Sequence, residues 1–157
     1  MGDITLDAAL TLLTGNERAP RLNALLYAKL PTGDKNDGLG TGEADWGGGL
    51  GIRQKYAAWA VYAEALAIRP GTSTSYDPET YWDWLLSVSY RIRPSLQPGI
   101  SLAGGTAPFA GGDDPLEIKA RLSGLSGEHT SYSLYLARGL SDASPDWSLG
   151  IIGYLDF

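Results

Sequence analysis

The chain contains no cysteine and few of the other residues on which catalysis depends. Its 157 residues include one histidine, one methionine and two phenylalanines. Without cysteine it can form no disulfide, thiolate metal site or cysteine nucleophile. The single histidine, His129, falls in a predicted short turn with no nucleophile or carboxylate fixed nearby, so a Ser-His-Asp arrangement has one candidate base in an unsuitable place. We therefore expect no enzymatic activity, no catalytic residue, no metal and no cofactor.

Long hydrophobic stretches are also absent. No segment approaches the 18 consecutive apolar residues of a transmembrane helix, and the mean hydropathy is −0.13. The net charge of −6, without any basic run, argues against a nucleic-acid partner. Met1 is followed at once by polar Gly2-Asp3 rather than by a signal peptide, which predicts either a mature form with an added methionine or a chain that is not secreted.

Alternation of apolar and polar residues is what the chain does contain, and it is clearest over residues 81–94, where the odd positions are nearly all polar or charged. A β-strand sends alternate side chains to opposite faces, so this segment has one apolar and one polar face. It is also long enough to cross a bilayer as a tilted strand, which takes about 9–11 residues. The apolar positions are Trp82, Trp84, Leu86, Val88, Tyr90 and Ile92.

Similar alternation predicts nine strands. They cover 3–13, 21–31, 46–56, 59–69, 81–94, a glycine-rich strand ending near 108, 116–125, 131–140, and a last strand from 147. Four glycines in the third strand predict strong curvature or a close approach from inside: Gly47, Gly48, Gly49 and Gly51. Short turns (57–58, 95–97, 127–130) alternate along the chain with longer loops (32–45, 71–80, 109–115, 141–145). Outer-membrane barrels have the same alternation of short periplasmic turns and long extracellular loops.

These patterns predict a single all-β domain over residues 1–157, an antiparallel up-and-down transmembrane β-barrel of nine strands, with eight to ten plausible. Bacterial single-chain barrels use even numbers, and nine strands would make the closing pair parallel. Three explanations remain open: a miscount, a missing preceding strand, or a different closure.

Aromatic residues sort by depth along the apolar face. If the long loops are extracellular, one group lies at the extracellular end: Trp46, Trp82, Trp84 and Trp147. A second group lies at the periplasmic end: Tyr56, Trp59, Tyr90, Tyr132 and Phe157. Two such belts are typical of strands whose partner is a lipid bilayer or detergent. The alternative is a soluble antiparallel barrel or sandwich with the apolar set inside, because alternation alone does not say which face is inner.

The polar face carries the charges that would line a lumen. The predicted lumen-facing set is Asp7, Lys29, Arg53, Lys55, Glu64, Asp83, Arg91, Arg93, Glu117, Lys119 and Arg121. Charges in a narrow lumen pair with each other or stay hydrated. Two interpretations remain: a lumen plugged by ion pairs with a structural role, or a narrow polar conduit whose basic periplasmic half (Arg53, Lys55, Arg91, Arg93) mildly favours anions.

Four stretches carry a resemblance to a known family: Gly2-Asp3-Ile4-Thr5-Leu6, Ala28-Lys29-Leu30-Pro31-Thr32-Gly33, the Gly-Thr-Gly-Glu-Ala-Asp run at 40–45, and Ser141-Asp142-Ala143-Ser144-Pro145-Asp146. The chain resembles, over essentially its whole length, the outer-membrane barrels of the phenol meta-degradation pathway (MetA-like) type and related uncharacterised outer-membrane barrels. The resemblance implies location in the bacterial outer membrane and passage of small molecules, aromatic compounds among them. Those families usually extend further at the N-terminus, so we expect this chain to be their C-terminal portion or a short relative.

Three hypotheses about function follow. The preferred one is an outer-membrane β-barrel that forms a narrow pore or passive transporter for small molecules. The second is a non-conducting barrel that acts as a scaffold or binds partners through its long outer loops. The third is a soluble β-barrel that binds a hydrophobic ligand.

Overall fold

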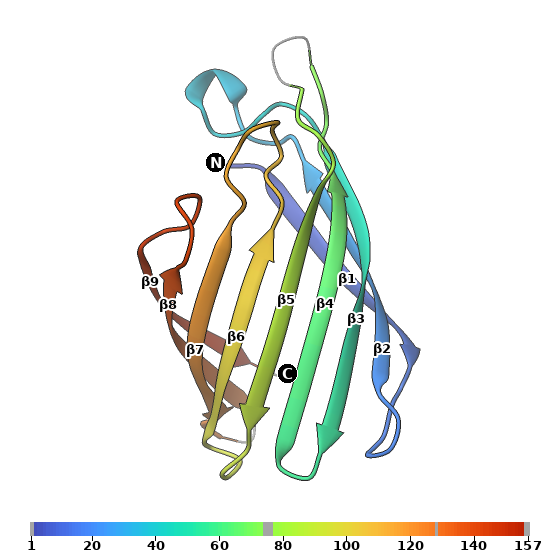
Figure 1. The fold of residues 1–157 in the computed structure, drawn as a ribbon, viewed down its shortest axis with the longest axis vertical. Coiled ribbons are helices and arrows are strands. Elements are labelled where there is room, and N and C mark those ends of the chain that lie inside the picture. The colour runs from blue at the N-terminus through green and yellow to red at the C-terminus, as the bar shows by residue number, and fades with distance from the viewer. Residues whose placement is uncertain (1, 74–76, 128, 156–157) are drawn as a thin grey trace.

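A single antiparallel sheet makes up the fold. The computed structural model describes residues 2–73, 77–127 and 129–155 (Figure 1). Its nine strands are β1 (Ile4–Leu13), β2 (Arg21–Leu30), β3 (Asp45–Tyr56), β4 (Trp59–Arg69), β5 (Tyr81–Tyr90), β6 (Gln97–Gly105), β7 (Leu116–Leu125), β8 (Thr130–Gly139) and β9 (Trp147–Leu155). Each pairs with the next in sequence order. The prediction of nine antiparallel up-and-down strands is confirmed.

The connections define two ends of the sheet. At the short-turn end lie 14–20, 57–58, 91–96 and 126–129; at the long-loop end lie 31–44, 70–80, 106–115 and 140–146. A short 3-10 helix, Lys35–Asp37, sits in the first long loop. None of the described residues forms a helix long and apolar enough to cross a membrane.

Both edges of the sheet are free. Within the described part of the chain β1 pairs only with β2, and β9 only with β8, so the sheet is curled but its ends are not joined. Because nine antiparallel strands alternate in direction, β1 and β9 run the same way, from the long-loop end to the short-turn end. Joining them directly would require a parallel pair, as the odd count predicted.

The fifth predicted strand ends earlier than its alternation suggested. β5 stops at Tyr90 instead of continuing to Pro94, and the turn occupies 91–96 instead of 95–97. Here Leu96 N donates to Arg93 O at 2.9 Å and Arg93 N to Leu96 O at 3.3 Å, which closes a four-residue turn. Pro94 is the second residue of that turn, the position for which its fixed φ suits it. Residues 91–93 therefore continue the apolar–polar alternation of the sequence but do not belong to the nine-stranded sheet.

The glycines of β3 allow the close approaches that the sequence predicted. A Cβ added at Gly49 would overlap the carbonyl of Ala65 on β4, and one at Gly51 would lie 2.9 Å from the hydroxyl of Tyr62. The neighbouring strand and its tyrosine therefore occupy the space that side chains would need, and the expected curvature has a local cause.

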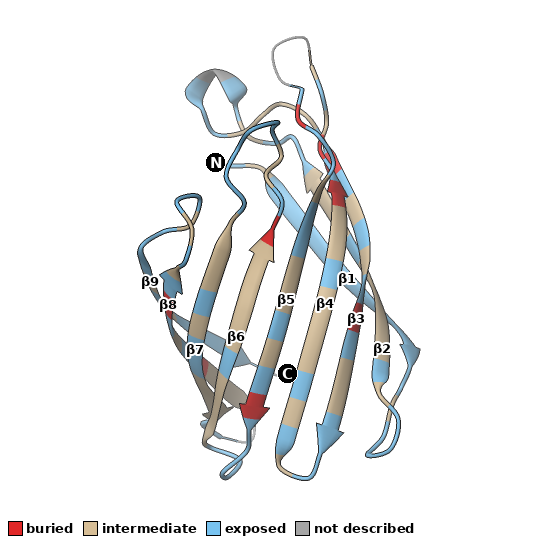
Figure 2. Cartoon of the chain, in the orientation of Figure 1, coloured by how far each residue is buried: buried red, intermediate tan, exposed pale blue. Residues whose placement is uncertain are grey.

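The sheet encloses almost no apolar core. Ile68 and Ala137 are the only buried hydrophobic residues among those described, and no large side chain is fully buried. Most of the large aliphatic residues are instead exposed on one face, with Leu149 79% and Ile151 78% exposed. Figure 2 shows the strands as mostly exposed or half-buried. A soluble barrel would pack these residues against each other, and the described strands do not.

Candidate functional site on the concave face

The strand register brings the predicted charged residues to one face. Residues directly opposite each other in an antiparallel pair share a face, and the pairing runs unbroken from β1 to β9. By this register the residues on that common face include Asp7, Lys29, Arg53, Lys55, Glu64, Asp83, Glu117, Lys119 and Arg121. Arg91 follows β5 and lines cavities on the same side. Arg93 lies in the turn at 91–96, outside the strands.

This polar face is concave. A cavity of about 660 Å³ is lined by residues of every strand from β2 to β9, so the sheet curls around it. Its lining combines cations with small hydroxyl residues: Arg21, Arg53 and Arg121 stand among Ser87, Ser89, Ser101, Ser123 and Ser131. The opposite, apolar face is therefore convex. The space inside the curve can hold water and polar solutes.

Acidic side chains gather at the long-loop end of the concave face. A cavity of about 390 Å³ there is lined in part by Glu64, Asp83 and Glu117. Two of these have neighbours on the same face: Glu64 accepts a hydrogen bond from the Tyr62 hydroxyl, and Glu117 lies 3.1 Å from Lys119 Nζ.

Lys29 organises the loops at this end. Its Nζ lies 2.7 Å from Asp45 Oδ2 and 3.7 Å from Asp3 Oδ2, with all three side chains largely buried. The two carboxylates also accept backbone hydrogen bonds, Asp3 from Gly33 N at 2.9 Å and Asp45 from Gly71 N at 3.0 Å. One charged cluster thus fastens the loops 31–44 and 70–80 to the sheet.

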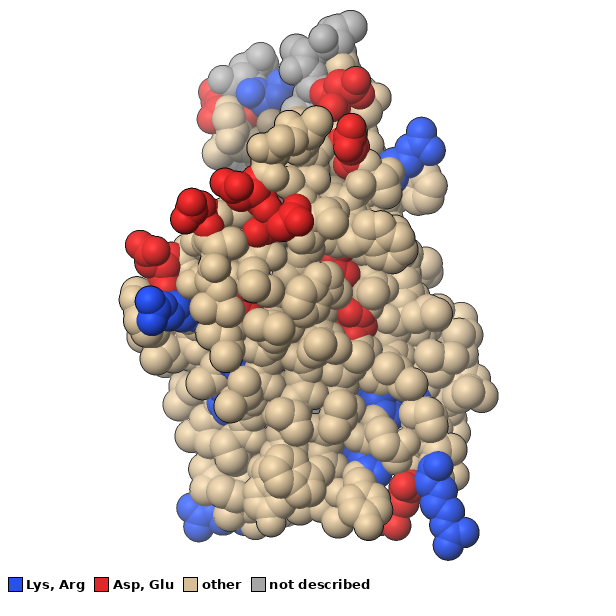
Figure 3. Space-filling view, viewed as in Figure 1, with Lys and Arg blue, Asp and Glu red and all other residues tan. Residues whose placement is uncertain are grey.

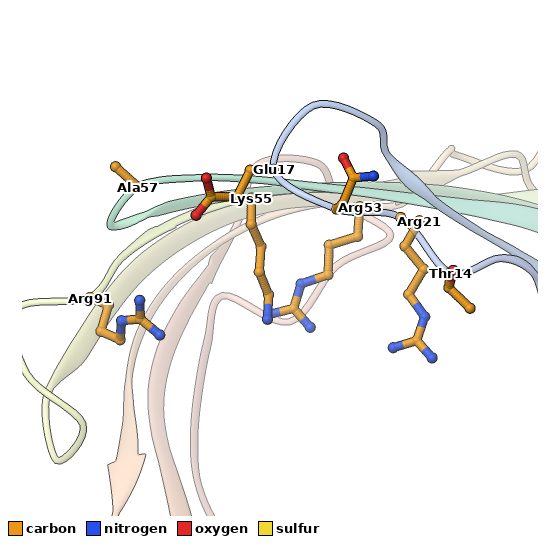
Figure 4. Close-up of a pocket in the computed structure, with 9 residues that line it drawn as sticks. Thr14, Glu17, Arg21, Arg53, Lys55, Ala57 and Arg91 are labelled. Atoms are coloured by element: carbon orange, nitrogen blue, oxygen red, sulfur yellow. The ribbon is translucent and has the colours of Figure 1, made fainter.

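Basic side chains gather at the short-turn end. A pocket of about 340 Å³ is lined there by Arg21, Arg53, Lys55 and Arg91, and Glu17 from the loop 14–20 also lines it. Figure 4 shows Arg21, Arg53 and Lys55 extending from the sheet to the same side, with Arg91 beside them. We call these four residues the basic pocket. The concave face is thus acidic at one end and basic at the other.

The convex face carries aromatic residues near both ends. Trp46, Trp82 and Trp147 are exposed at the long-loop end, and Trp84 lies across Gly104. At the short-turn end Tyr56 is exposed, and the rings of Trp59 and Tyr90 lie 4.8 Å apart.

Two further aromatic residues had been assigned to the short-turn end. The Tyr132 hydroxyl there donates to Ser95 O at 2.8 Å. Phe157 lies outside the described residues. Between the two ends, the face viewed in Figure 3 is mostly uncharged.

A comparison with protein families identifies the relationship. The profile of the family described as "Putative MetA-pathway of phenol degradation" matches residues 1–113. The chain belongs to this family. The match spans β1 to β6 and ends in the loop 106–115. A search of curated proteins found no match.

In this MetA-family chain, all four residues of the basic pocket lie within the matched region, whereas Glu117, Lys119 and Arg121 lie beyond it. Sequence reasoning left one pocket residue, Arg21, out of the lumen-facing set. Its alternation placed it on the polar face of its strand, but nothing in the sequence indicated that it stands directly opposite Arg53.

Proposed function

We propose that this MetA-family chain forms the wall of an outer-membrane β-barrel that acts as a narrow pore or passive transporter for small molecules. The observation that carries the proposal is the sorting of the two faces. Large aliphatic and aromatic side chains are exposed on the convex face, while charged and hydroxyl side chains surround the cavity inside the curve. Water on the outside of such a sheet would meet apolar surface nearly everywhere, so hydrocarbon is the environment that suits it.

Several features support placement in a membrane. The strands contain 9 to 12 residues, the length that crosses a hydrocarbon core when tilted. Exposed tryptophans at one end and the Tyr56, Trp59 and Tyr90 group at the other match the two interfaces of a bilayer. In this proposal the long loops are extracellular, and the lipid bilayer is the principal partner.

The conduit would be the polar interior, and the protein would pass solutes without transforming them. The cavity of about 660 Å³ is large enough for a small molecule. His129, the one histidine, is exposed in the turn 126–129 and lies on no cavity wall described above. The family name suggests phenol-related compounds among the permeants.

Single-channel recording in planar lipid bilayers tests the proposal. We expect discrete conductance steps from the refolded chain, reduced when a bulky residue replaces Ser101 or Ser123 on the cavity wall. A chain that folds in lipid but carries no current would exclude the pore.

A second candidate is a non-conducting barrel that binds partners through its outer loops. The Lys29 cluster favours it, because ion pairs and backbone hydrogen bonds hold the loops 31–44 and 70–80 to the end of the sheet. If the protein is a pore, shortening these loops should increase its conductance. If it is a binding scaffold, the same change should abolish partner binding, and no current should be seen before or after it. Folding to high concentration without detergent would instead favour a soluble ligand-binding protein.

A further inference from the structure

Two arginines face each other across neighbouring strands of the basic pocket. Arg21 on β2 is the direct register partner of Arg53 on β3. Directly opposed residues have Cβ atoms about 4.5–5.5 Å apart, and like charges in that position destabilise a sheet. Lys55 stands two residues beyond Arg53 on the same face, and Arg91 completes the wall of the same pocket.

No carboxylate of the described residues neutralises these four cations, because none of the four forms an ion pair with one. Arg21 Nη2 donates to Thr11 Oγ1 at 3.0 Å, a neutral partner, and Glu17 lines the pocket without pairing with them. Elsewhere on the concave face two lysines do have carboxylate partners: Lys29 pairs with Asp45, and Lys119 with Glu117.

We propose that the basic pocket binds a small dianion, a solute that carries a phosphate group or two carboxylates. Guanidinium groups pair with both chemistries through two parallel hydrogen bonds, and a lysine ammonium adds a point charge. Several cations around one pocket favour two negative charges over one, and about 340 Å³ accommodates a compact solute. This deepens the proposed function, on which it rests, since it names an anionic class among the solutes that enter the concave side.

Binding can be measured directly on the whole chain, folded in detergent micelles, by isothermal titration calorimetry at constant ionic strength. The probes are inorganic phosphate and succinate, with acetate as the monovalent comparison. Arg53→Gln and Arg21→Gln should each weaken dianion binding at least tenfold, because each removes a charge-assisted contact. Lys119→Gln is the matched control: it removes the same charge from the same face, but from a residue that pairs with Glu117. It should change binding by less than about twofold.

The phosphate and succinate arms identify which dianion chemistry the pocket prefers. Binding of both no tighter than acetate would overturn the proposal. Equal losses in Lys119→Gln and Arg53→Gln would overturn it too, because they would indicate general attraction to a charged surface.

Thermal unfolding gives an independent measurement. Without ligand, Arg53→Gln should melt no lower than the wild type, since it relieves the repulsion with Arg21. Phosphate should raise the melting temperature of the wild type more than that of the variant. Arg91 lies outside the strands. Arg91→Gln can therefore be used to test dianion binding if a variant within a strand does not fold.

The outcomes separate this inference from the proposed pore. A protein that binds phosphate without conducting retains the basic pocket and loses the pore. If the protein conducts but binds neither dianion, the proposed pore stands and the dianion site is excluded.

Discussion

The guanidinium carbon of Arg138 lies 5.4 Å from the centroid of the Trp147 ring, and the two residues are direct register partners on β8 and β9. The same arrangement recurs between Arg69 and Trp46, partners on β4 and β3, at 5.9 Å. Both pairs lie on the convex face at the long-loop end. Arg69 and Arg138 are the charged side chains of that face among the described strand residues. An arginine whose stem lies on apolar surface and whose head stacks on tryptophan suits the boundary between hydrocarbon and water.

A double-mutant cycle should detect the stacking of this pair. Arg138→Ala and Trp147→Ala, separately and together, should give a coupling of about 0.5–1 kcal/mol in the free energy of unfolding, measured by urea titration in lipid vesicles. The pair Arg138 and Trp46, on strands far apart in the sheet, is the control and should couple by less than about 0.5 kcal/mol. Equal coupling in both cycles would contradict direct stacking.

Charge placed on the convex face should distinguish lipid from water as its environment. Leu86 lies midway along β5 and is 51% exposed. In a bilayer, Leu86→Arg should lower the free energy of unfolding by about 2–4 kcal/mol, because the guanidinium enters hydrocarbon. On a water-exposed surface the same change stays within about 0.5 kcal/mol.

Leu39, exposed in the loop 31–44, provides the matched control for this experiment. Leu39→Arg should leave stability in vesicles nearly unchanged. If Leu86→Arg behaves like Leu39→Arg, the convex face does not contact lipid.

Removal of the Lys29 side-chain charge should destabilise the long-loop end. Lys29→Met leaves the largely buried carboxylates of Asp3 and Asp45 without their cation, a change that costs about 3 kcal/mol for a buried ion pair. Lys119→Met is the control, since its pair with Glu117 is more exposed and is worth about 0–1 kcal/mol. Urea unfolding measures both, and limited proteolysis of the loop 31–44 should accelerate only in Lys29→Met.

Two glycines of β9 should respond oppositely to alanine. A Cβ at Gly150 would run into the ring of Tyr135, whereas one at Gly153 would meet nothing within 4 Å. Gly150→Ala should therefore cost about 1–3 kcal/mol through overpacking, while Gly153→Ala should be neutral or slightly stabilising. Tyr135→Ala should relieve the Gly150→Ala defect, and Tyr135→Phe should not, because the ring remains. Equal effects at the two glycines would argue against this packing of Tyr135.

Much of the sheet could be predicted because a strand has a period of two. The alternation around Leu86 identifies a strand and its two faces without any knowledge of neighbours, and the predicted bounds of β4, Trp59 to Arg69, agree with the structure. Up-and-down order follows because each connection is short enough to join adjacent antiparallel strands. The prediction that the third strand's glycines admit close neighbours also depended only on local chemistry.

The rest depends on register, which alternation does not specify. Arg21 meets Arg53 because of the way the turn 14–20 and the next hairpin align the strands, and the ladder itself shifts between Thr11 and Leu13. Lys29 meets Asp45 for the same reason. Arg93 continues the alternation of residues 81–94 at a polar position, yet it lies in the turn that contains Pro94 and not in the sheet. Arg69 and Arg138 are charged but lie on the apolar face, against the alternation. Each stacks on a tryptophan, which makes a cation acceptable there.

The opposite signs of charge at the two ends of the concave face give the sheet an electric dipole parallel to its strands. A conduit with such a built-in field is electrically asymmetric, and an ion that moves along it meets a different sequence of potentials in each direction. If the proposed pore conducts, its current should therefore rectify. Its size at a given voltage should depend on the sign of that voltage, and exchanging Arg53 for a carboxylate should weaken the asymmetry.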